Sequence, residues 1–179
     1  SDIDTATVSV SDDDTGAGSA GTSVTVNNVI PVVTIGTDLI IMEGETVTDT
    51  VSYSDVGTLD ALWSYLIGWG EGASITGDSA LQSDLFTVSH TYEVSGVFIA
   101  TACFTDKNGG LGCSSRTITV LSAAAAAQLL EDTILALGLS GGTKASLTSA
   151  LDVASSAFDA GRTTPGVKLM ESFIIRVEA

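Results

Sequence analysis

Residues 103–120, CFTDKNGGLGCSSRTITV, decide the fold, because the chain carries a second version of them near its start. Residues 9–26, SVSDDDTGAGSAGTSVTV, align with this stretch without a gap at an offset of 94 residues. The alignment pairs Asp12 with Asp106 and Gly18 with Gly112. The offset of 94 residues is close to the length of one β-sandwich domain, which is about 100 residues. The chain therefore contains the last two strands of one sandwich, followed by a complete one.

Short runs of alternating residues continue from the start of the chain to residue 120. They are rich in Thr, Val, Ser and Ile, and clusters of Asp, Gly and Asn separate them. β-Branched residues with period-two alternation favour strands, and the clusters favour turns. This part of the sequence predicts an all-β architecture.

The composition changes at Ser122 to Ala, Leu and spaced charges, and the apolar period becomes helical. We expect three helices at about 124–137, 144–160 and 165–178. Their core faces are Leu147, Leu151, Ala154 and Phe158 in the second helix, and Met170, Phe173, Ile174 and Val177 in the third. Their boundaries are marked by Gly138, Gly141, Gly142 and Gly161 as stops, and by Thr164 as an N-cap before Pro165.

The 179 residues therefore divide into three expected parts. Residues 1–27 are the last two strands of a preceding sandwich, 28–121 a complete sandwich and 122–179 a small helical domain. A lone two-stranded hairpin is marginal in water, so something must complete residues 1–26. Two sources fit. Either the natural polypeptide continues upstream, which we favour, or the hairpin inserts into a neighbouring copy and links subunits into a filament.

The charge of the chain excludes two classes of partner. There are 22 acidic and 6 basic residues, which give a formal net charge of −16, and the basic residues are scattered singly. Such a surface repels nucleic acid and anionic membranes. No apolar stretch reaches the 18 to 20 residues or so that a spanning helix needs, so we expect no membrane insertion.

The two cysteines, Cys103 and Cys113, lack the further Cys or His residues that a structural zinc site requires. In an oxidising compartment we expect them to form a disulfide. Their equivalents in the first copy are Ser9 and Ser19, so the pair was exchanged together.

Six motifs in residues 28–120 resemble, in order, those of the polycystic-kidney-disease (PKD) domain of bacterial and archaeal surface proteins. They are Asn28-Val-Ile-Pro31, Glu43-Gly44-Glu45, residues 53–63 (YSDVGTLDALW), Gly68-Trp69-Gly70-Glu71-Gly72, His90-Thr91-Tyr92 with Gly96, and Phe104-Thr105-Asp106 through Gly110. The resemblance implies an immunoglobulin-like β-sandwich and an extracellular location.

The same resemblance implies a calcium site where the chain enters the sandwich. Carried over by motif, its ligands are Asn28, Asp55 and Asp106, with Ser54 and Asp60 as further candidates. Carboxylate and amide oxygens are ligands that Ca²⁺ prefers. The alternative is turn formation without metal, which Asp and Asn also favour.

The last 55 or so residues are similar to the helical FIMAH domain that ends secreted bacterial and archaeal proteins. Residues 147–158 and the run Phe173-Ile-Ile-Arg-Val177 carry this likeness. It implies no particular activity.

The remaining motifs favour structural roles. Gly16-Ala-Gly18-Ser-Ala-Gly21 has the letters of a dinucleotide-binding loop, but the repeat places it in a hairpin turn. We expect packing roles for His90, Tyr92, Trp63 and Trp69, although the tryptophans could instead stack on sugars. No arrangement typical of a nucleophile, a metalloprotease or a phosphate-binding loop is present, so we expect no enzyme.

These observations together predict a non-catalytic extracellular structural or adhesion module of a cell-surface, surface-layer or filament protein. Its expected partners are copies of itself or tandem sandwich domains, and a polysaccharide or protein surface is a further candidate. The alternative is the ancillary, substrate-binding C-terminal region of a secreted protease or glycosidase.

Overall fold

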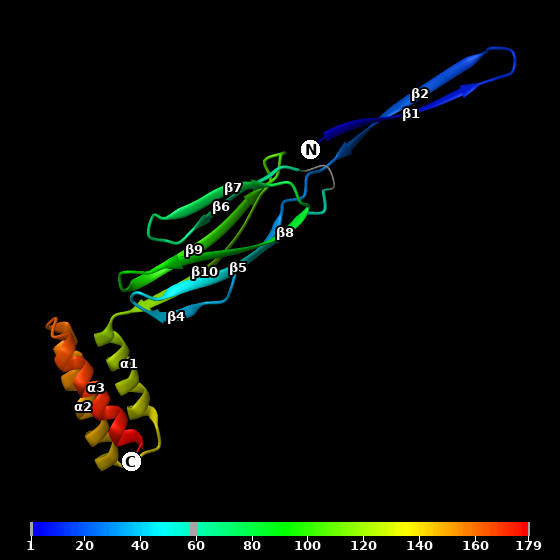
Figure 1. Cartoon of the computed structure of the whole chain (residues 1–179). Helices are drawn as coiled ribbons and strands as arrows, with labels where there is room; N and C mark the ends of the chain where they lie inside the picture. The colour runs from blue at the N-terminus through cyan, green and yellow to red at the C-terminus, as the bar shows by residue number, and fades with distance from the viewer. Residues whose placement is uncertain (1, 58–60, 179) are drawn as a thin grey trace. The chain divides into compact units, whose positions relative to one another are not determined.

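The computed structural model describes residues 2–57 and 61–178, and within them it shows ten strands followed by three helices (Figure 1). The strands are β1 (Asp2–Ser11), β2 (Ala17–Val26), β3 (Val32–Thr34), β4 (Leu39–Met42), β5 (Thr46–Ser54), β6 (Trp63–Gly68), β7 (Ser74–Ser79), β8 (Ser83–Thr91), β9 (Gly96–Thr105) and β10 (Leu111–Leu121). The helices are α1 (Ala123–Ala136), α2 (Gly141–Asp159) and α3 (Thr163–Glu178).

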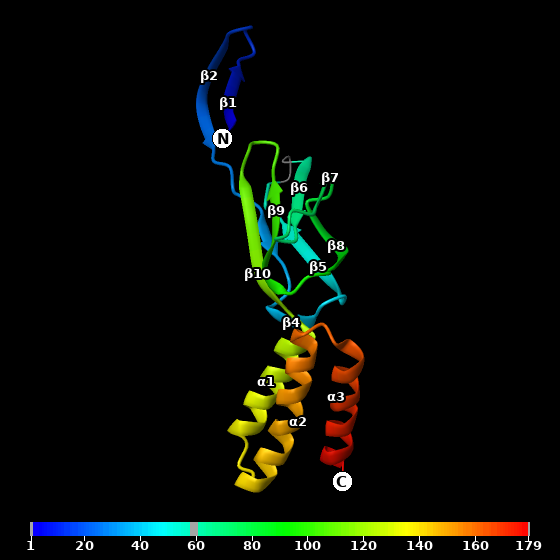
Figure 2. The same ribbon diagram turned by 90° about the vertical axis from the view of Figure 1, so that its left-hand side faces the viewer.

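Strands β3 to β10 form two sheets (Figures 1 and 2). One sheet has the order β4-β10-β9-β6-β7 and the other β3-β5-β8. Strand β4 runs parallel to β10, while β6 is antiparallel to both β7 and β9. This arrangement confirms the predicted immunoglobulin-like β-sandwich with α-helices after it. Within residues 2–57 and 61–178, strands β1 and β2 pair only with each other, as a separate antiparallel hairpin.

The chain divides into two compact units, and strands β5, β8, β9 and β10 contribute to both. The first unit comprises residues 1–36, 49–88 and 100–116, and the second comprises residues 37–48, 89–99 and 117–179.

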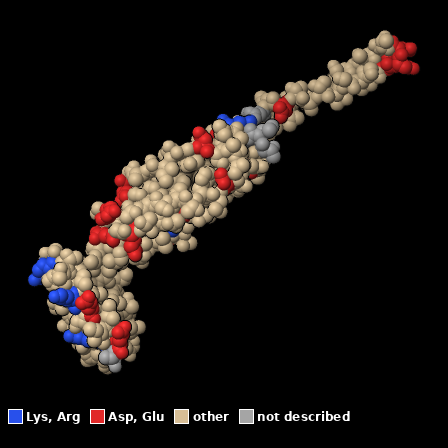
Figure 3. All heavy atoms as spheres, viewed as in Figure 1, with Lys and Arg blue, Asp and Glu red and all other residues tan. Residues whose placement is uncertain are grey.

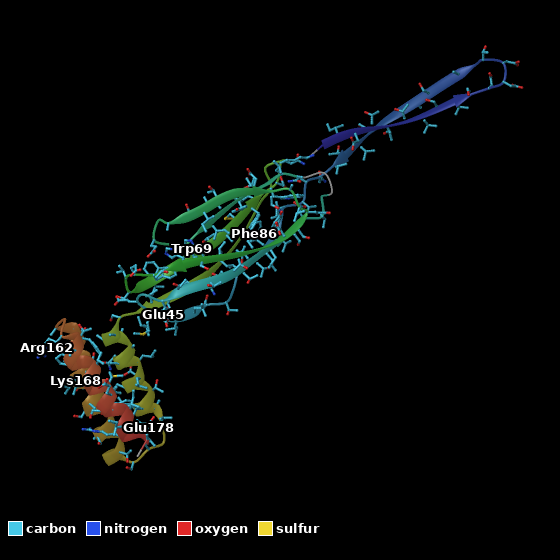
Figure 4. The ribbon with its side chains drawn as sticks, in the orientation of Figure 1. Glu45, Trp69, Phe86, Arg162, Lys168 and Glu178 are labelled. Atoms are coloured by element: carbon cyan, nitrogen blue, oxygen red, sulfur yellow. A yellow bond between two sulfur atoms is a disulfide. The ribbon has the colours of Figure 1, made fainter. Side chains whose placement is uncertain are left out.

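Aromatic side chains form the core of the first unit. Tyr53 of β5 stacks on Phe104 of β9 with 4.2 Å between ring centroids, which joins the two sheets. Trp63 and Trp69 are 1% and 2% exposed, so their expected packing roles are confirmed. Trp69 and Phe86 are labelled within the sandwich in Figure 4.

Tyr92 organises the sandwich residues of the second unit. Its side chain is fully buried, and the His90 ring lies perpendicular to its ring with 4.8 Å between centroids. Its backbone N–H donates to the Glu45 carbonyl, and its carbonyl accepts from Gly44 N–H. Gly44 adopts φ +81°, a conformation that favours glycine. Structural roles for His90 and Tyr92 are therefore confirmed.

The three helices pack around Ile134, Leu151 and Phe173, which are 5%, 0% and 6% exposed. Helix α2 ends in a Schellman motif, because Gly161 at φ +68° donates to Phe158 and Arg162 donates to Ala157.

Some helix boundaries differ from those expected. Helix α2 begins at Gly141 rather than at residue 144, since the Ser140 hydroxyl accepts from Thr143 N–H and caps it. Gly141 and Gly142 therefore start a helix instead of stopping one. Helix α3 begins at Thr163, so Thr164 is not its N-cap. The predicted apolar face was also too wide, since Ile174 and Val177 are 49% and 58% exposed.

An ion pair that sequence reasoning missed lies inside the sandwich. Arg116 Nη2 of β10 is 2.6 Å from Asp49 Oδ2 of β5, and the two side chains are 5% and 3% exposed. A Cβ on Gly36 would lie 2.7 Å from Arg116 Nη1 and 2.9 Å from Asp49 Oδ1, so a side chain there would displace the ion pair. Burial raises the pKa of Asp49, and the opposing effect of Arg116 does not fully offset it.

We predict that Asp49→Ala lowers the free energy of unfolding by about 3–5 kcal/mol, because it leaves the Arg116 charge buried without its carboxylate. The double variant Asp49→Leu/Arg116→Met should recover most of this loss, since neither charge then remains buried. Urea denaturation of the three proteins measures both effects. A double variant no more stable than Asp49→Ala would contradict the explanation.

Candidate functional site

The residues predicted to bind calcium centre on the place where the chain enters the sandwich. The segment between β2 and β3, residues 27–31, passes over the turn that joins β9 to β10. We call the residues that meet there the lead-in corner: Asn28, Pro31, Asp106, Gly110 and Gly112.

Asp106 builds the turn at this corner. Its Oδ1 accepts hydrogen bonds of 2.8 Å from the backbone N–H groups of Asn108 and Gly110. Its own N–H donates to the Gly110 carbonyl at 3.0 Å, and Gly109 N–H donates to the Asp106 carbonyl. Gly109 adopts φ +83°, which a side chain would disfavour. The pattern Asp-x-Asn-Gly-Gly thus closes a hairpin by local hydrogen bonding.

Asn28 joins the lead-in segment to this turn. Its Nδ2 donates to Asp106 Oδ2 at 2.7 Å across 78 residues of sequence. Asn28 Oδ1 is buried and, within the described residues, has no hydrogen-bond partner. The two residues that the sequence paired as ligands therefore contact each other, and one amide oxygen remains available.

A second contact at this corner involves backbone alone. A Cβ built on Gly112 of β10 would lie 1.8 Å from the Pro31 carbonyl oxygen, so any side chain there would displace the lead-in segment. The sequence showed Gly112 only as a repeated glycine, and its role required the structure.

Two opposing effects act on the pKa of Asp106. Burial acts to raise it, since the residue is only 4% exposed. The hydrogen bonds from Asn28, Gly110, Asn108 and Gly109 favour the ionised form and outweigh burial, so the pKa lies below its ordinary value. Asp106 is thus held as a carboxylate whose negative charge is largely satisfied by donors.

Asp55 and Ser54, two further predicted calcium ligands, take no part in the contact between Asn28 and Asp106. Asp55 Oδ2 accepts from the buried Trp63 Nε1 at 2.9 Å, and its Oδ1 accepts from Gly57 N–H at 2.9 Å. Ser54 is an exposed residue at the end of β5, opposite Val32 in the sheet. Asp60 lies outside the described residues.

The repeated turn in β1–β2 has the same local geometry. Asp12 Oδ1 accepts from the N–H groups of Asp14 and Gly16 at 3.1 and 2.6 Å, and Asp12 N–H donates to the Gly16 carbonyl. Each of these bonds corresponds to one made by Asp106 at the offset of 94 residues. The G-x-G-x-x-G motif lies in this turn and in β2, as its hairpin interpretation predicts.

Cys103 and Cys113 form a disulfide between β9 and β10, with 4.1 Å between their Cα atoms. Both side chains lie on the outer face of the sheet, since the core residues Ala102 and Phe104 alternate with Cys103 along β9. In the first copy Ser9 and Ser19 are direct partners across β1 and β2. The disulfide predicted from the paired exchange is therefore present.

Solved structures of sandwich domains resemble part of the chain. The PKD1 domain of Vibrio anguillarum Epp is 21% identical with a TM-score of 0.38, and the match covers 54% of this chain and 99% of that domain. The PKD1 domain of the Vibrio cholerae metalloprotease PrtV is 21% identical, with a TM-score of 0.34 and coverages of 51% and 98%. A CARDB domain from Pyrococcus furiosus, described in complex with di-metal ions, is 11% identical, with a TM-score of 0.41 and coverages of 53% and 95%.

These likenesses concern the sandwich fold and not an activity. No protein-family model matches the sequence, and no curated protein matches it. The similarity of the helices to the FIMAH domain stays a prediction.

Calcium binding at the lead-in corner stays a proposal, which the residues fit in part. Asn28 Oδ1 and Asp106 Oδ2 are two oxygens of the kind that Ca²⁺ prefers, and the buried Oδ1 lacks a donor. Against this, Asp55 is engaged elsewhere, and the described residues contain no group of three or more His, Cys, Asp or Glu side chains placed to share a metal ion. Asn28 and Asp106 would hold the ion together with backbone carbonyls.

We predict that millimolar calcium raises the melting temperature relative to chelator by roughly 5–10 °C, if its concentration is about a hundredfold above Kd. Differential scanning calorimetry measures the shift. Asn28→Ala and Asp106→Ala should abolish it. Asp12→Ala is the matched control, because Asp12 makes the same turn without an asparagine beside it, and it should keep the shift. Identical melting with calcium and chelator would reject the site.

We also predict a specific acid sensitivity from Asp106. Because its pKa is lowered by folding, its stabilisation is complete above the ordinary value of 3.8 and is lost as the pH falls through the lower value of the folded state. The free energies of unfolding of wild type and Asp106→Asn should therefore converge between about pH 5 and pH 2. Asp49 titrates in both proteins, so its effect cancels. Parallel curves over this range would contradict the lowered pKa.

Proposed function

We propose that this chain is a non-catalytic structural module of a secreted or cell-surface protein, built to extend or connect its neighbours rather than to transform a substrate. The observation that carries this proposal is that the side chains best suited to catalysis or ligand binding are used by the fold itself.

The buried acidic residues illustrate this use. Asp49 pairs with Arg116, Asp55 accepts from the Trp63 indole and Asp106 accepts from Asn28 and its own turn. A general acid or base needs a carboxyl group that faces a substrate. In the described residues, each of these buried carboxyl groups instead faces a donor of the protein.

The aromatic residues are used in the same way. Tyr53, Trp63, Trp69, Tyr92, Phe104 and Phe173 are buried, and the other four aromatic side chains are half-buried. Binding of polysaccharides in extended grooves relies on exposed aromatic faces that stack on sugar rings. Among the described residues, no aromatic side chain falls in the exposed class, which favours a structural role over the sugar-stacking alternative for Trp63 and Trp69.

The position of the disulfide supports an extracellular location. Cys113 is exposed and Cys103 half-buried, so solvent reductants can reach the bond. Such bonds persist in oxidising compartments and are rare where thiols are kept reduced.

The distribution of charge fits the same conclusion. Figure 3 shows acidic side chains at the tip of the β1–β2 hairpin, where Asp12, Asp13 and Asp14 lie, and along the sandwich. Across the described chain, each helix is too short or too polar to span a bilayer.

One surface feature favours the alternative of an ancillary, substrate-binding region. A shallow depression of about 600 Å³ lies on the outer face of the five-stranded sheet. Leu66 and Leu111, which are 47% and 54% exposed, line it beside the disulfide and Asp78. If the chain binds a polymer, this is where contact is expected.

We predict that the chain stays in solution when it is mixed with insoluble cellulose, chitin or denatured collagen, because it offers no exposed aromatic platform. Sedimentation of the polymer and assay of the supernatant measure this.

The natively isolated protein should also contain no free thiols, as an oxidising compartment requires.

Leu66→Asp tests the depression, and Leu85→Asp is the matched control, since Leu85 is an exposed leucine of the other sheet. Binding to one polymer that is lost in Leu66→Asp and kept in Leu85→Asp would establish the ancillary role. Two titratable thiols in the native protein would refute the extracellular location.

A further inference from the structure

One face of the β1–β2 hairpin carries four valines, with Asp4 on the same face. The pairing of Val8 with Ala20 and of Asp4 with Val24 places the even-numbered residues of both strands on the same side. Val8, Val10, Val24 and Val26 lie on it, and we call this side the valine face. Their side chains are 67%, 68%, 45% and 50% exposed.

The same positions are buried in the second copy. At the offset of 94 residues, the valine face corresponds to Ala102, Phe104, Ile118 and Val120, which are 0%, 0%, 0% and 3% exposed. Those residues face the core of the sandwich and are covered by the other sheet. The hairpin therefore exposes a face whose equivalent in the second copy is buried in the sandwich core.

Gly18 gives an independent indication of what is missing. Its equivalent, Gly112, must be glycine because the Pro31 carbonyl would lie 1.8 Å from a Cβ. A Cβ on Gly18 would meet nothing within 4 Å. The hairpin thus keeps a glycine that nothing in the described chain requires, at the position where a lead-in segment crosses the second copy.

Asp12 gives a third indication. Its Oδ1 makes the same backbone hydrogen bonds as Asp106 Oδ1. Asp106 Oδ2 also accepts from Asn28 of the lead-in segment, whereas no donor from the described residues reaches Asp12 Oδ2. The two missing contacts, over Gly18 and at Asp12, are those that a lead-in segment supplies.

We propose that the valine face is the docking surface for six further sandwich strands, equivalent to β3–β8, that precede the hairpin in the same polypeptide. In the completed sandwich, β1 pairs with the equivalent of β6 as β9 does, and β2 pairs in parallel with the equivalent of β4 as β10 does. A lead-in segment crosses Gly18 and donates to Asp12. This interaction surface does not depend on the function proposed above.

A second copy of this chain fits the surface poorly. Its own β9 and β10 already fill the places next to β6 and β4, and its own Asn28 and Pro31 are engaged at Asp106 and Gly112. Two hairpins packed face to face would cover the valines but would explain neither Gly18 nor Asp12.

The hairpin also sets the chemistry of the strands that cover it. Thr22 stands where the second copy has Arg116, so the hairpin offers no cation to a buried acid at the position of Asp49. Val10 replaces Phe104, so larger apolar side chains must fill the space that the phenyl ring occupies in the second copy. We therefore expect the covering strands to share the fold of β3–β8 and to differ from them in core sequence.

A tandem probe tests the docking surface. Residues 28–95 of this chain are placed directly ahead of residue 2, which preserves the spacing of 94 residues, and Val10→Phe and Thr22→Arg give the hairpin the side chains that this copy requires. Hydrogen exchange is followed at the amides of β1 and β2. We expect it to slow at least tenfold relative to the 179-residue chain, because these amides become part of a closed sheet.

Paired variants of the probe separate docking from general effects. Val24→Asp on the valine face should restore fast exchange, whereas Ser23→Asp on the opposite face should not. Gly18→Ala should restore it in the probe and leave the stability of the 179-residue chain unchanged. Equally fast exchange in the probe and the original chain, with residues 28–121 still protected in both, would overturn the proposal.

The natively isolated protein gives a test that does not depend on the probe folding. Oxidative footprinting should find Val8 and Val24 protected, and mass spectrometry should find peptides that precede Ser1. Protected valines in a polypeptide that begins at Ser1 would place the covering strands on another chain. That result would overturn the proposal that these strands precede the hairpin in the same polypeptide. A dimer of the 179-residue chain that Val24→Asp dissociates would show a second copy there, and would overturn it as well.

Discussion

The sandwich depends on one close approach, the passage of Pro31 over Gly112 that the Asn28–Asp106 hydrogen bond secures. This contact joins the first segment of the domain to its last hairpin, across 78 residues of sequence. The aromatic stack of Tyr53 on Phe104 can form only when that hairpin lies over the other sheet. Closure of the domain is therefore a long-range event, and long-range contacts of this kind make folding slow relative to helical proteins of similar size.

The buried charged groups follow from the same requirement for closure. Each of Asp49, Asp55 and Asp106 connects segments that are distant in sequence or closes a turn, and each has a donor within hydrogen-bonding distance. A buried carboxylate without such a donor would cost several kcal/mol. In the described residues, these three buried acids thus connect parts of the fold to one another.

The sequence was sufficient for the fold class because the repeat, the two-residue period and the motif order all point to the same sandwich. The family resemblance assigned Asn28 and Asp106 to one calcium site, and the structure shows that the two side chains contact each other, while calcium binding there stays a prediction. It could not show that Asp55 binds the Trp63 indole, because a motif gives a residue type and not the direction of its side chain. The Asp49–Arg116 pair could have been found, since both residues occupy inward positions of alternating strands. The role of Gly112 could not have been found, because the sequence does not show which backbone segments approach each other closely.

The two copies of the closing hairpin share residues that set the backbone geometry and differ in residues that face the core. Asp12 and Asp106 make the same turn, and Gly18 and Gly112 occupy the same strand position. Thr22 and Arg116 differ, however, and so do Val10 and Phe104. If β1–β2 displaced β9–β10 from the sandwich, Asp49 would be buried without a cation and Tyr53 would lose its stacking partner, both of which are unfavourable. The disulfide does not prevent such an exchange, because it links β9 only to β10. Discrimination between neighbouring hairpins therefore rests on their core side chains, which allows similar sandwiches to follow one another in a chain without exchanging strands.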